Sequence, residues 1–324
     1  MATPKRRQCG TMVLDAKLSE RYPSYRRNQE RIEQGIRRSI LSGQAERLQR
    51  KLLTIPVVVH VVWKKPEENI SDAQIKSQIT VLNKDFLGTN PDKSKAPPVW
   101  SALVANANLK FELAKKDPAG QKSTGITRTQ TTRGSFGTAN DVKKTSKGGA
   151  DAWPSDKYLN LWVCNLAENL LGYAQFPGGP AATDGVVILY TAFGTTGVAA
   201  APFGLGRTAT HEIGHWLNLR HIWGDRNDCG GTDFVTDTPN QQLPNTGKPA
   251  FPHVTCNNGP NGDMFMNYMD YVDDDTMVMF TDGQVARMHA ALEFARPDLG
   301  RLADVPDDPP ALVSPKVRRR RPVS

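Results

Sequence analysis

The stretch His211-Glu-Ile-Gly-His-Trp-Leu-Asn-Leu-Arg-His221 constrains this chain more than any other. Residues four apart on an α-helix share one face and lie about 6 Å apart, so a helix here presents His211 and His215 to a single metal ion. Glu212 lies one position round the helix, where it can reach a metal-bound water without ligating the ion. His221 reaches the same ion only if the helix ends first and the chain bends back. Asn218 is the expected end point, because asparagine tolerates left-handed backbone angles.

Three histidines with one open position are typical of a catalytic zinc site. Three of the six histidines in the chain fall within these eleven residues. The spacing resembles the metzincin signature H-E-x-x-H-x-x-G-x-x-H, with Asn218 in place of the glycine. A chance HExxH on an ordinary amphipathic helix is the alternative, and the third histidine at the right offset argues against it.

The formal charge of +8 is concentrated at the two ends of the chain. Residues 1–52 carry thirteen Lys and Arg against five Asp and Glu, and residues 316–324 carry five basic residues and no acid. The remainder holds 23 basic and 28 acidic residues and is mildly acidic. A polyanion-binding protein usually carries its charge on a folded face, so this function is only an alternative and no nucleic-acid partner is expected.

Neither a membrane span nor a secretion signal is evident in the sequence. No run of about 18 apolar residues occurs, so no membrane-spanning helix is expected. The first residues, Met-Ala-Thr-Pro-Lys-Arg-Arg-Gln-Cys9, lack the apolar region of a signal peptide. Export would therefore use a signal outside this sequence, or none.

Strand and helix signals alternate as far as the histidine helix and predict an α/β fold. The run Leu53–Trp63 is rich in β-branched residues and is expected to be buried on both faces, with His60 as a core residue or a support for the metal site. Cys164 is expected to be a buried free thiol. The other expected strands are 108–114, 158–166, 185–190 and an edge strand at 171–177, the expected helices are 71–86, 281–296 and a polar helical stretch at 11–50, and residues 115–150 are expected to be exposed connections.

Downstream of the histidines lie Cys229, Cys256 and the stretch Asn267-Tyr-Met-Asp-Tyr271. Together with HEIGHWLNLRHIWGD, LNLWVCNL and LLGYAQFP, these features resemble the pappalysin family of metzincin metallopeptidases, and most closely its ulilysin-type members. The resemblance covers roughly residues 53–296, with a matching pro-segment before it. It implies a metzincin-type zincin of the α/β class, with a mixed twisted sheet, a long zinc-binding helix and an irregular C-terminal subdomain.

The resemblance also implies how the chain is divided and what it does. Residues 1–51 would be an inhibitory pro-segment, residues 52–303 the catalytic domain, and residues 304–324 a disordered basic tail. The upper subdomain would extend to about residue 221, and the lower one would span 222–303. The expected activity is that of a zinc-dependent endopeptidase acting on proteins or peptides, whose substrates would lie along 171–177. A zinc-bearing module that binds proteins without cleaving them is the alternative, and Glu212 argues against it.

Several residues receive roles from the same resemblance. His211, His215 and His221 would bind zinc, with Glu212 as the general base. Tyr271 would stabilise the oxyanion, and Met269 would form a hydrophobic floor beneath the metal, although a lone methionine is more often core packing. Asp275 matches the acid at the base of the pocket that receives a basic residue, which predicts cleavage before Arg or Lys. The alternative is that Asp273, Asp274 and Asp275 form a solvated acidic turn.

Arg7-Gln-Cys-Gly-Thr11 resembles the cysteine-switch pro-segments of the family. The thiolate of Cys9 would be the fourth zinc ligand in the latent form and would exclude the catalytic water. A free cysteine in a mobile terminus is the alternative. A peptidase that prefers Arg or Lys after the cut could free itself within Arg47–Lys51.

Two further expectations concern stability. Cys229 and Cys256 match a family disulfide, which indicates an oxidising, secreted or extracytoplasmic location. Asp233, Thr236 and Thr238 match a structural calcium loop, although an ordinary Asp/Thr turn is the alternative. The sequence leaves the oligomeric state open.

Overall fold

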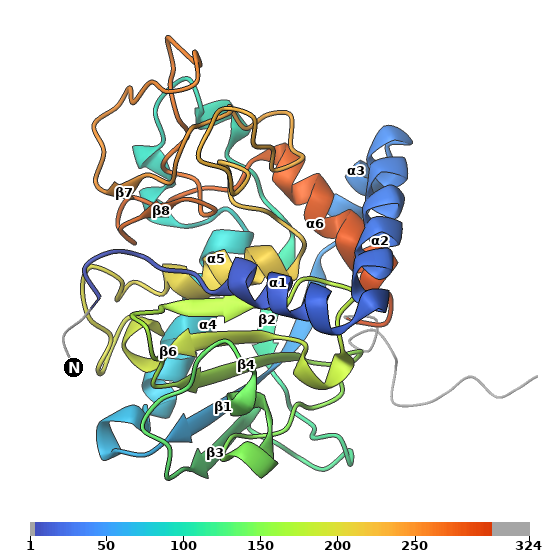
Figure 1. Ribbon diagram of the computed structural model, residues 1–324, viewed down its shortest axis with the longest axis vertical. Helices are drawn as coiled ribbons and strands as arrows, with labels where there is room; N and C mark the ends of the chain where they lie inside the picture. The colour runs from blue at the N-terminus through green and yellow to red at the C-terminus, as the bar shows by residue number, and fades with distance from the viewer. Residues whose placement is uncertain (1–3, 300–324) are drawn as a thin grey trace, which may run out of the picture.

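The computed structural model describes residues 4–299 and combines a mixed sheet, a central helix and a largely irregular C-terminal part. In Figure 1 the sheet lies below α5 (Arg207–Trp216) and the C-terminal loops lie above it. This arrangement confirms the predicted α/β fold with an irregular C-terminal part. The predicted basic tail at 304–324 lies outside the described residues.

The central strand is β1 (Leu53–Trp63), which the run of β-branched residues predicted with the same bounds. It is parallel to β4 (Leu159–Cys164) on one side. On its other side, β2 (Leu109–Leu113) pairs with its first half and β3 (Ile126–Gln130) with its second half. Neighbours on both edges and apolar packing on both faces explain why β1 is an almost continuous apolar run.

The sheet continues beyond β4 in the order β2-β1-β4-β6-β5. β6 (Val186–Leu189) is parallel to β4, whereas β5 (Gly172–Ala174) is antiparallel to β6 and lies at the edge, as predicted. The free edge of β5 faces the N-terminal segment, where Cys9 forms a parallel bridge to Gly172.

The prediction of exposed connections over residues 115–150 is wrong in part. This segment supplies β3, and further along it Val142 and Lys143 are buried. The Lys143 ammonium donates to Thr183 O at 2.7 Å. A five-residue strand in which only Ile126 is apolar gives a weak sequence signal, and its pairing with β1 is what makes it a strand.

The helices follow their predicted signals closely. α4 (Asp72–Phe86) begins after Ser71, whose hydroxyl accepts a hydrogen bond from Gln74 N, and α6 (Asp282–Ala295) begins with a Thr281/Gln284 capping box. The stretch 11–50 forms three helices, namely α1 (Thr11–Arg21), α2 (Pro23–Leu41) and α3 (Gln44–Gln49). Non-helical residues separate them at position 22 and at positions 42–43.

The remaining elements are short. Among residues 4–299, no helix combines the length and the apolar character that crossing a bilayer requires. The short strands are β7 (Thr246–Gly247) and β8 (Tyr271–Val272), and the 3-10 turns are η1 (Pro66–Glu68), η2 (Pro91–Lys95), η3 (Ser101–Leu103), η4 (Asp141–Lys143), η5 (Thr145–Lys147), η6 (Ala181–Thr183) and η7 (Tyr190–Ala192).

His60 is a core residue. Its Nδ1 lies 2.8 Å from Thr127 Oγ1, its Nε2 lies 2.9 Å from Asn160 Oδ1, and its ring stacks on Trp162. Burial lowers the pKa of His60 to about 4, because the charged imidazolium loses its hydration. Cys164 is a buried free thiol, as predicted.

The environment of His60 predicts a pH dependence of stability. The pKa is about 4 in the folded protein and near 6.5 in the unfolded chain, so the unfolded chain binds more protons between these values. Stability that His60 contributes above pH 6.5 is therefore lost as the pH falls towards 4, by up to about 3 kcal/mol. We expect His60→Gln to lack this loss. Urea unfolding at a series of pH values measures it, and parallel curves for the two proteins would contradict it.

Candidate active site

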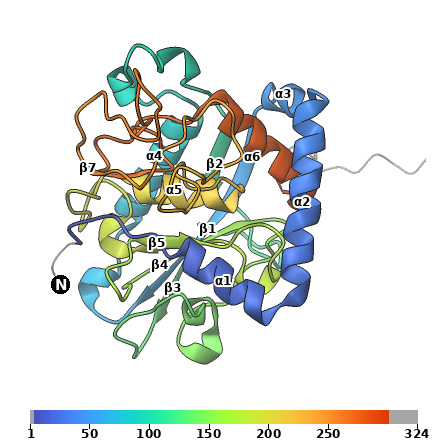
Figure 2. The ribbon, with the colours of Figure 1, turned by 45° about the horizontal axis from the view of Figure 1, so that its top comes forward.

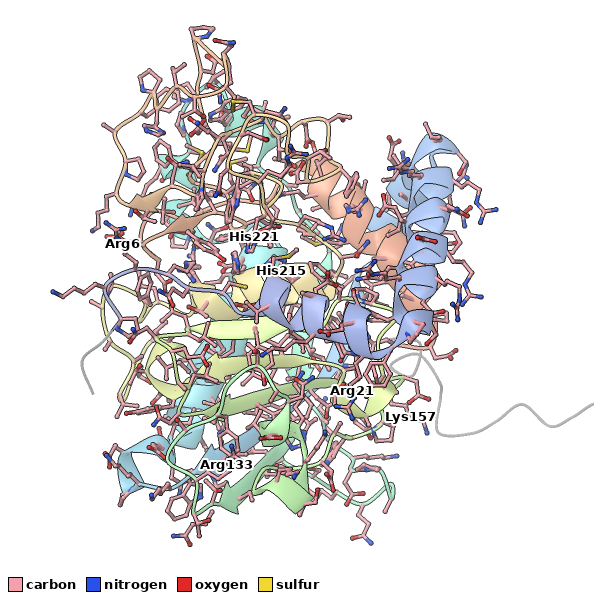
Figure 3. The ribbon with its side chains drawn as sticks, in the orientation of Figure 1. Arg6, Arg21, Arg133, Lys157, His215 and His221 are labelled. Carbon is pink, nitrogen blue, oxygen red and sulfur yellow. A yellow bond between two sulfur atoms is a disulfide. The ribbon has the colours of Figure 1, made fainter. Side chains whose placement is uncertain are left out.

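The metal centre begins on α5, which is buried along its whole length. The helix ends at Trp216, and Asn218 follows with a φ of 70° and donates its N–H to His215 O at 2.8 Å. The chain reverses at this point, and His221 Nε2 comes to 3.0 Å from His215 Nε2. Figure 3 shows His215 and His221 together beside the extended N-terminal segment. The predicted helix end at Asn218 is confirmed.

The three histidines are oriented by acceptors on their outer ring nitrogens. Their Nδ1 atoms lie close to Tyr268 O (2.7 Å, His211), Leu219 O (2.8 Å, His215) and Asp225 Oδ1 (2.5 Å, His221). When Nδ1 donates to these acceptors, each Nε2 keeps a lone pair that can bind a cation. Burial holds the pKa of His211 and His215 well below the ordinary value, which keeps both rings neutral.

These donors fit a zinc ion. His211 Nε2 is buried without a hydrogen-bond partner, which a metal bond would satisfy. The ligand atoms of Cys9 and the three histidines all lie within 4.8 Å of one another. Tetrahedral zinc holds its ligand atoms about 3.3 to 3.8 Å apart, so a small contraction suffices. Across residues 4–299 this is the one group of three or more His, Cys, Asp or Glu that could hold a metal ion.

Glu212 lies beside this donor set and is buried. Its Oε2 accepts a hydrogen bond from Thr11 Oγ1 at 2.9 Å and one from Cys9 Sγ at 3.4 Å. Burial raises the pKa of Glu212 to about 7, although these hydrogen bonds oppose the shift. A carboxylate with a pKa near neutrality is suited to accept and return a proton.

Met269 and Tyr271 come from a C-terminal loop that packs against α5. A Cβ on Gly214 would lie 2.5 Å from Met269 Sδ, so the helix needs a glycine where this sulfur packs. The Tyr271 ring centroid lies 5.7 Å from that of His211 and 4.9 Å from that of His221. The structure therefore brings both predicted residues to the metal centre.

The N-terminal segment crosses the cleft along the edge of β5. Gly10 N donates to Gly172 O at 2.9 Å, and Leu171 N donates to Gln8 O at 3.0 Å. Gly172 must be a glycine, because a Cβ there would lie 2.9 Å from Glu212 Cγ. The edge strand predicted to bind substrate is thus paired with the chain's own pro-segment.

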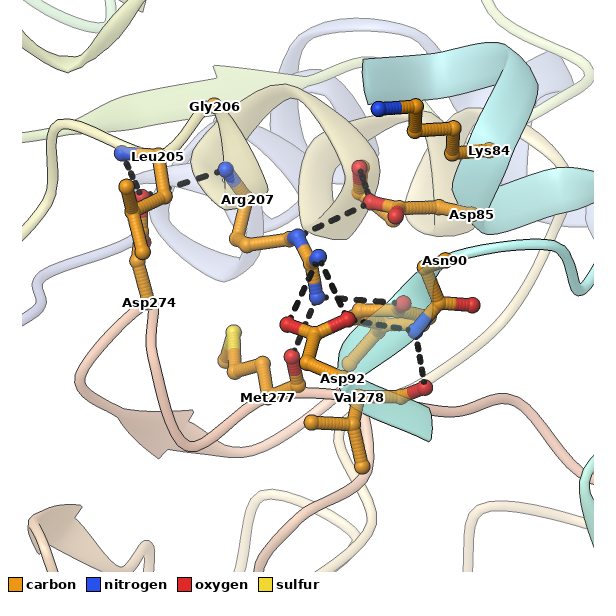
Figure 4. Close-up of polar contacts among 12 residues, drawn as sticks. Lys84, Asp85, Asn90, Asp92, Leu205, Gly206, Arg207, Asp274, Met277 and Val278 are labelled. Carbon is orange, nitrogen blue, oxygen red and sulfur yellow. Dashed lines mark hydrogen bonds and ion pairs between the residues drawn. The ribbon is translucent and has the colours of Figure 1, made fainter. Parts of the chain in front are cut away.

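Arg7 fills a buried pocket next to the metal centre and is only 3% exposed. Its Nη2 lies 2.6 Å from Asp274 Oδ1, its Nη1 donates to Thr208 Oγ1 at 3.0 Å, and its guanidinium lies over the Phe203 ring. The other oxygen of Asp274 accepts hydrogen bonds from Leu205 N at 2.8 Å and Arg207 N at 3.2 Å (Figure 4). No role at this site was predicted from the sequence for Arg7 or Asp274.

Asp275, the predicted pocket acid, lies elsewhere. Its side chain is 41% exposed and pairs with Lys248. These two residues line a small surface pocket with Leu205 and neighbouring residues. The spacing of Arg7 and Cys9 is the sequence signal that could have placed Arg7 at this site, since alternate residues of an extended segment face the same side.

Two predicted structural features lie in the loops after α5. Cys229 and Cys256 form the predicted disulfide, which ties the loop after the histidines to the loop before Met269. In the predicted calcium loop, Thr238 Oγ1 donates to Asp233 Oδ2 at 2.8 Å and Thr236 lies beside them in sequence. The calcium site stays a prediction.

His221 comes from a loop rather than a helix, and two contacts fix its ring. Trp223 stacks on it, with ring centroids 4.3 Å apart, and Asp225 binds its Nδ1. Asp225 has a φ of 57°, and its Oδ2 is buried without a partner. This strained, incompletely satisfied carboxylate therefore has one visible role, which is to hold the third metal ligand.

We expect Asp225→Asn to weaken zinc binding roughly 10- to 100-fold, because the amide orients His221 poorly and does not raise its basicity. Metal analysis after titration with a competing chelator measures the effect. The matched control is Asp228→Asn, since Asp228 is an exposed acid of the same loop that pairs with Arg226. Both variants should keep the thermal stability of the metal-free protein. Equal zinc retention in the two variants would contradict the role of Asp225.

The comparisons with known proteins agree with this site. The sequence profile of the M43 peptidase family, described as pregnancy-associated plasma protein-A, matches residues 143–293. An extracellular metalloprotease of Pyricularia oryzae is 32% identical over 246 residues, which are 73% of this chain and 74% of that protein. An extracellular metalloprotease of Verticillium alfalfae is 33% identical over 253 residues, which are 74% of this chain and 76% of that protein.

Two solved structures extend the comparison. Mature mirolysin of Tannerella forsythia, in complex with a cleaved peptide, is 50% identical with a TM-score of 0.77 and covers 78% of this chain and 97% of its own. A promirolysin mutant of the same organism is 45% identical with a TM-score of 0.83 and covers 91% of this chain and 97% of its own. These matches confirm the predicted zinc-dependent endopeptidase made as a zymogen, and the histidine cluster with Cys9 fits a cysteine switch. The chain belongs to the pappalysin family of metzincin metallopeptidases.

Proposed function

We propose that His211, His215 and His221 hold the catalytic zinc and that Glu212 is the general base of peptide hydrolysis. The observation that carries this proposal is the convergence of three Nε2 lone pairs beside a buried carboxylate. Zinc at this position supplies polarisation of the scissile carbonyl and a lowered pKa of water. Glu212 takes the proton from the attacking water and passes it to the leaving amine.

Tyr271 and Met269 complete the proposed machinery. The phenol of Tyr271 is placed to donate a hydrogen bond to the oxygen of the reacting carbonyl, because its ring packs against two of the histidines. Met269 packs against Gly214 and supports α5, the helix that carries His211 and His215. Substrate would pair with the edge of β5 once the N-terminal segment has left it.

The N-terminal segment keeps the enzyme latent by blocking three parts of the site at once. Arg7 fills the pocket of Asp274, Cys9 supplies the fourth zinc ligand, and the Thr11 hydroxyl binds Glu212. These alternate residues form the plug, which we define as residues 7–11. Burial raises the pKa of the Cys9 thiol well above its ordinary value, and a bound zinc would favour the thiolate.

The position of Arg7 supports a preference for basic residues and identifies the acid. Asp274 lies fully buried at the end of a pocket that already holds an arginine side chain. An arginine or lysine of the substrate after the scissile bond would take the place of Arg7. The role of Asp275 stays a prediction from the sequence, but the burial of Asp274 and its contact with Arg7 favour Asp274.

We also propose the boundaries of the pro-segment and of the catalytic domain. We place the pro-segment at 1–51 and the catalytic domain at 52–303, since β1 begins at residue 53. The upper subdomain would extend to about residue 221 and the lower subdomain would span 222–303. Secretion is supported by the Cys229–Cys256 disulfide and by relatives named extracellular metalloproteases. A structural calcium ion at Asp233, Thr236 and Thr238 would have to displace the hydrogen bond between Thr238 and Asp233.

Cleavage of a peptide library by the processed protein tests the proposed function. We expect cuts directly before Arg or Lys that a zinc chelator abolishes and added zinc restores. Glu212→Gln should lower kcat by about 10²- to 10⁴-fold while zinc stays bound, because only the proton transfer is lost. Metal analysis is the control for zinc content. A zinc-loaded protein that has lost residues 1–50 and makes no cuts would rule out the proposal.

Substitution of the two neighbouring acids separates their roles. Asp274→Asn should lower kcat/KM for substrates with Arg after the cut by about 30-fold or more, because a buried guanidinium loses its counter-charge. Asp275→Asn is the matched control and should change it less than about twofold, since its charge is exposed. Peptides with Leu at the same position report any general loss of activity. A larger decrease in kcat/KM for Asp275→Asn than for Asp274→Asn would identify Asp275 as the acid of the pocket.

A further inference from the structure

The pro-segment contacts the catalytic domain at a second place besides the cleft. α2 and α3 lie alongside α6 in both ribbon views (Figures 1 and 2). Their apolar side chains form a small hydrophobic cluster, separate from the main core, with one face of α6. Its members are Ile32, Ile36, Ala45, Ala286, Ala290 and Ala291.

The helices approach closely at this contact. A Cβ on Gly35 would lie only 2.8 Å from the ring of Phe294, so a glycine is required on the α2 side. The alanines of α6 leave room for Ile36, which is fully buried. Such complementary packing between small and large residues is typical of a specific helix contact rather than a loose cover.

An ion pair between a buried arginine and a partly exposed glutamate strengthens the same contact. Arg287 of α6 is 2% exposed and binds Glu33 of α2 through both of its terminal nitrogens. Its Nε donates to Asn218 O at 3.0 Å, in the turn that positions the third histidine. A further hydrogen bond runs from Ser39 Oγ to Glu293 Oε2 at 3.1 Å. The contact is therefore both apolar and charge-paired.

The bonds where the peptidase could free itself lie outside this contact. Arg50 and Lys51 are exposed and lie between α3 and β1. Upstream of them, the chain from residue 11 to residue 49 is helical apart from residues 22 and 42–43, and peptidases bind extended segments. A cut before either residue separates the chains but leaves the apolar cluster, the Glu33–Arg287 pair and the plug whole.

We propose that a cut before Arg50 or Lys51 does not activate the enzyme, because α2 and α3 stay docked on α6 and hold the plug in the cleft. Activation then needs a second step, the dissociation of the fragment. This inference rests on the proposed latency of the plug. The fraction of active enzyme should also depend on dilution. Before the cut the plug is covalently tethered, whereas after the cut it is held only by non-covalent contacts, and its dissociation is favoured at low concentration.

The test uses the full chain with Glu212→Ala, so that it cannot cut itself, and with the recognition sequence of a site-specific protease inserted after Arg50. The nicked protein is passed over a gel-filtration column with a zinc chelator present, which removes any contribution of Cys9. We expect the fragment to elute with the catalytic domain. Its immediate loss from the nicked protein would overturn the inference.

Matched variants of the pro-segment locate the contact. Glu33→Gln breaks the Glu33–Arg287 ion pair and should speed release of the fragment at least about tenfold, because Arg287 stays buried without its counter-charge. Arg37→Gln is the control and should change it less than about twofold, because Arg37 also contacts Glu33 but is largely exposed. Gly35→Val should speed release through a steric clash and keeps the ion pair. Unchanged release in both Glu33→Gln and Gly35→Val would overturn the assignment to α6.

A second arm with Glu212 intact and zinc bound separates this inference from the proposed function. Peptide cleavage by the nicked protein should show a lag, after which the activity per enzyme molecule is higher at greater dilution, because less of the fragment rebinds. Full activity at once, with the fragment still bound, would overturn the second step. A protein that loses the fragment on dilution yet never cleaves peptide would support docking on α6 and contradict the peptidase mechanism.

Discussion

The active site depends on one reversal of the backbone at Asn218. Without it, α5 would continue and point His221 away from the other two histidines. The reversal also sets the chemistry, because Leu219 O lies 2.8 Å from His215 Nδ1 and so selects the tautomer that leaves Nε2 free. Leu219 N in turn donates to Gly214 O, which closes the turn. This one turn thus ends the helix, orients His215 and directs the chain back so that His221 reaches the same site.

The same helix is fixed at its other end by a buried charge network (Figure 4). The Arg207 guanidinium lies 2.9 Å from Asp92 and 3.2 Å from Asp85, and it also binds Met277 O. Asp274 accepts hydrogen bonds from the backbone at the start of this helix, where a negative charge is favoured. The acid that binds Arg7 is therefore held at the start of the helix that carries His211 and His215, which fixes the pocket relative to these two metal ligands.

Local signals were sufficient to predict the parts of the fold in which neighbours in sequence decide the structure. The β-branched run of β1, the capping box of α6 and the helix end at Asn218 are of this kind. Partners distant in sequence decided the rest: β3 exists through its pairing with β1, and the Glu33–Arg287 pair joins two helices. Among the acids 273–275, a shift of one residue changes which side chain faces inward, so the sequence could indicate the cluster but not the member.

Two parts of the pro-segment contribute to latency in different ways, namely the plug and the helices α2 and α3. The plug makes short polar contacts with groups that substrate and water must reach, and a plug of five residues offers little apolar surface for binding. The helices α2 and α3 touch no catalytic group in the described structure, but they supply the apolar cluster and the Glu33–Arg287 ion pair with α6. Because attachment and blockage lie in different residues, the strength of latency can change through α2 without any change in the cleft. This separation lets the catalytic geometry be complete before activation, as the convergence of the three histidines in the plugged chain shows.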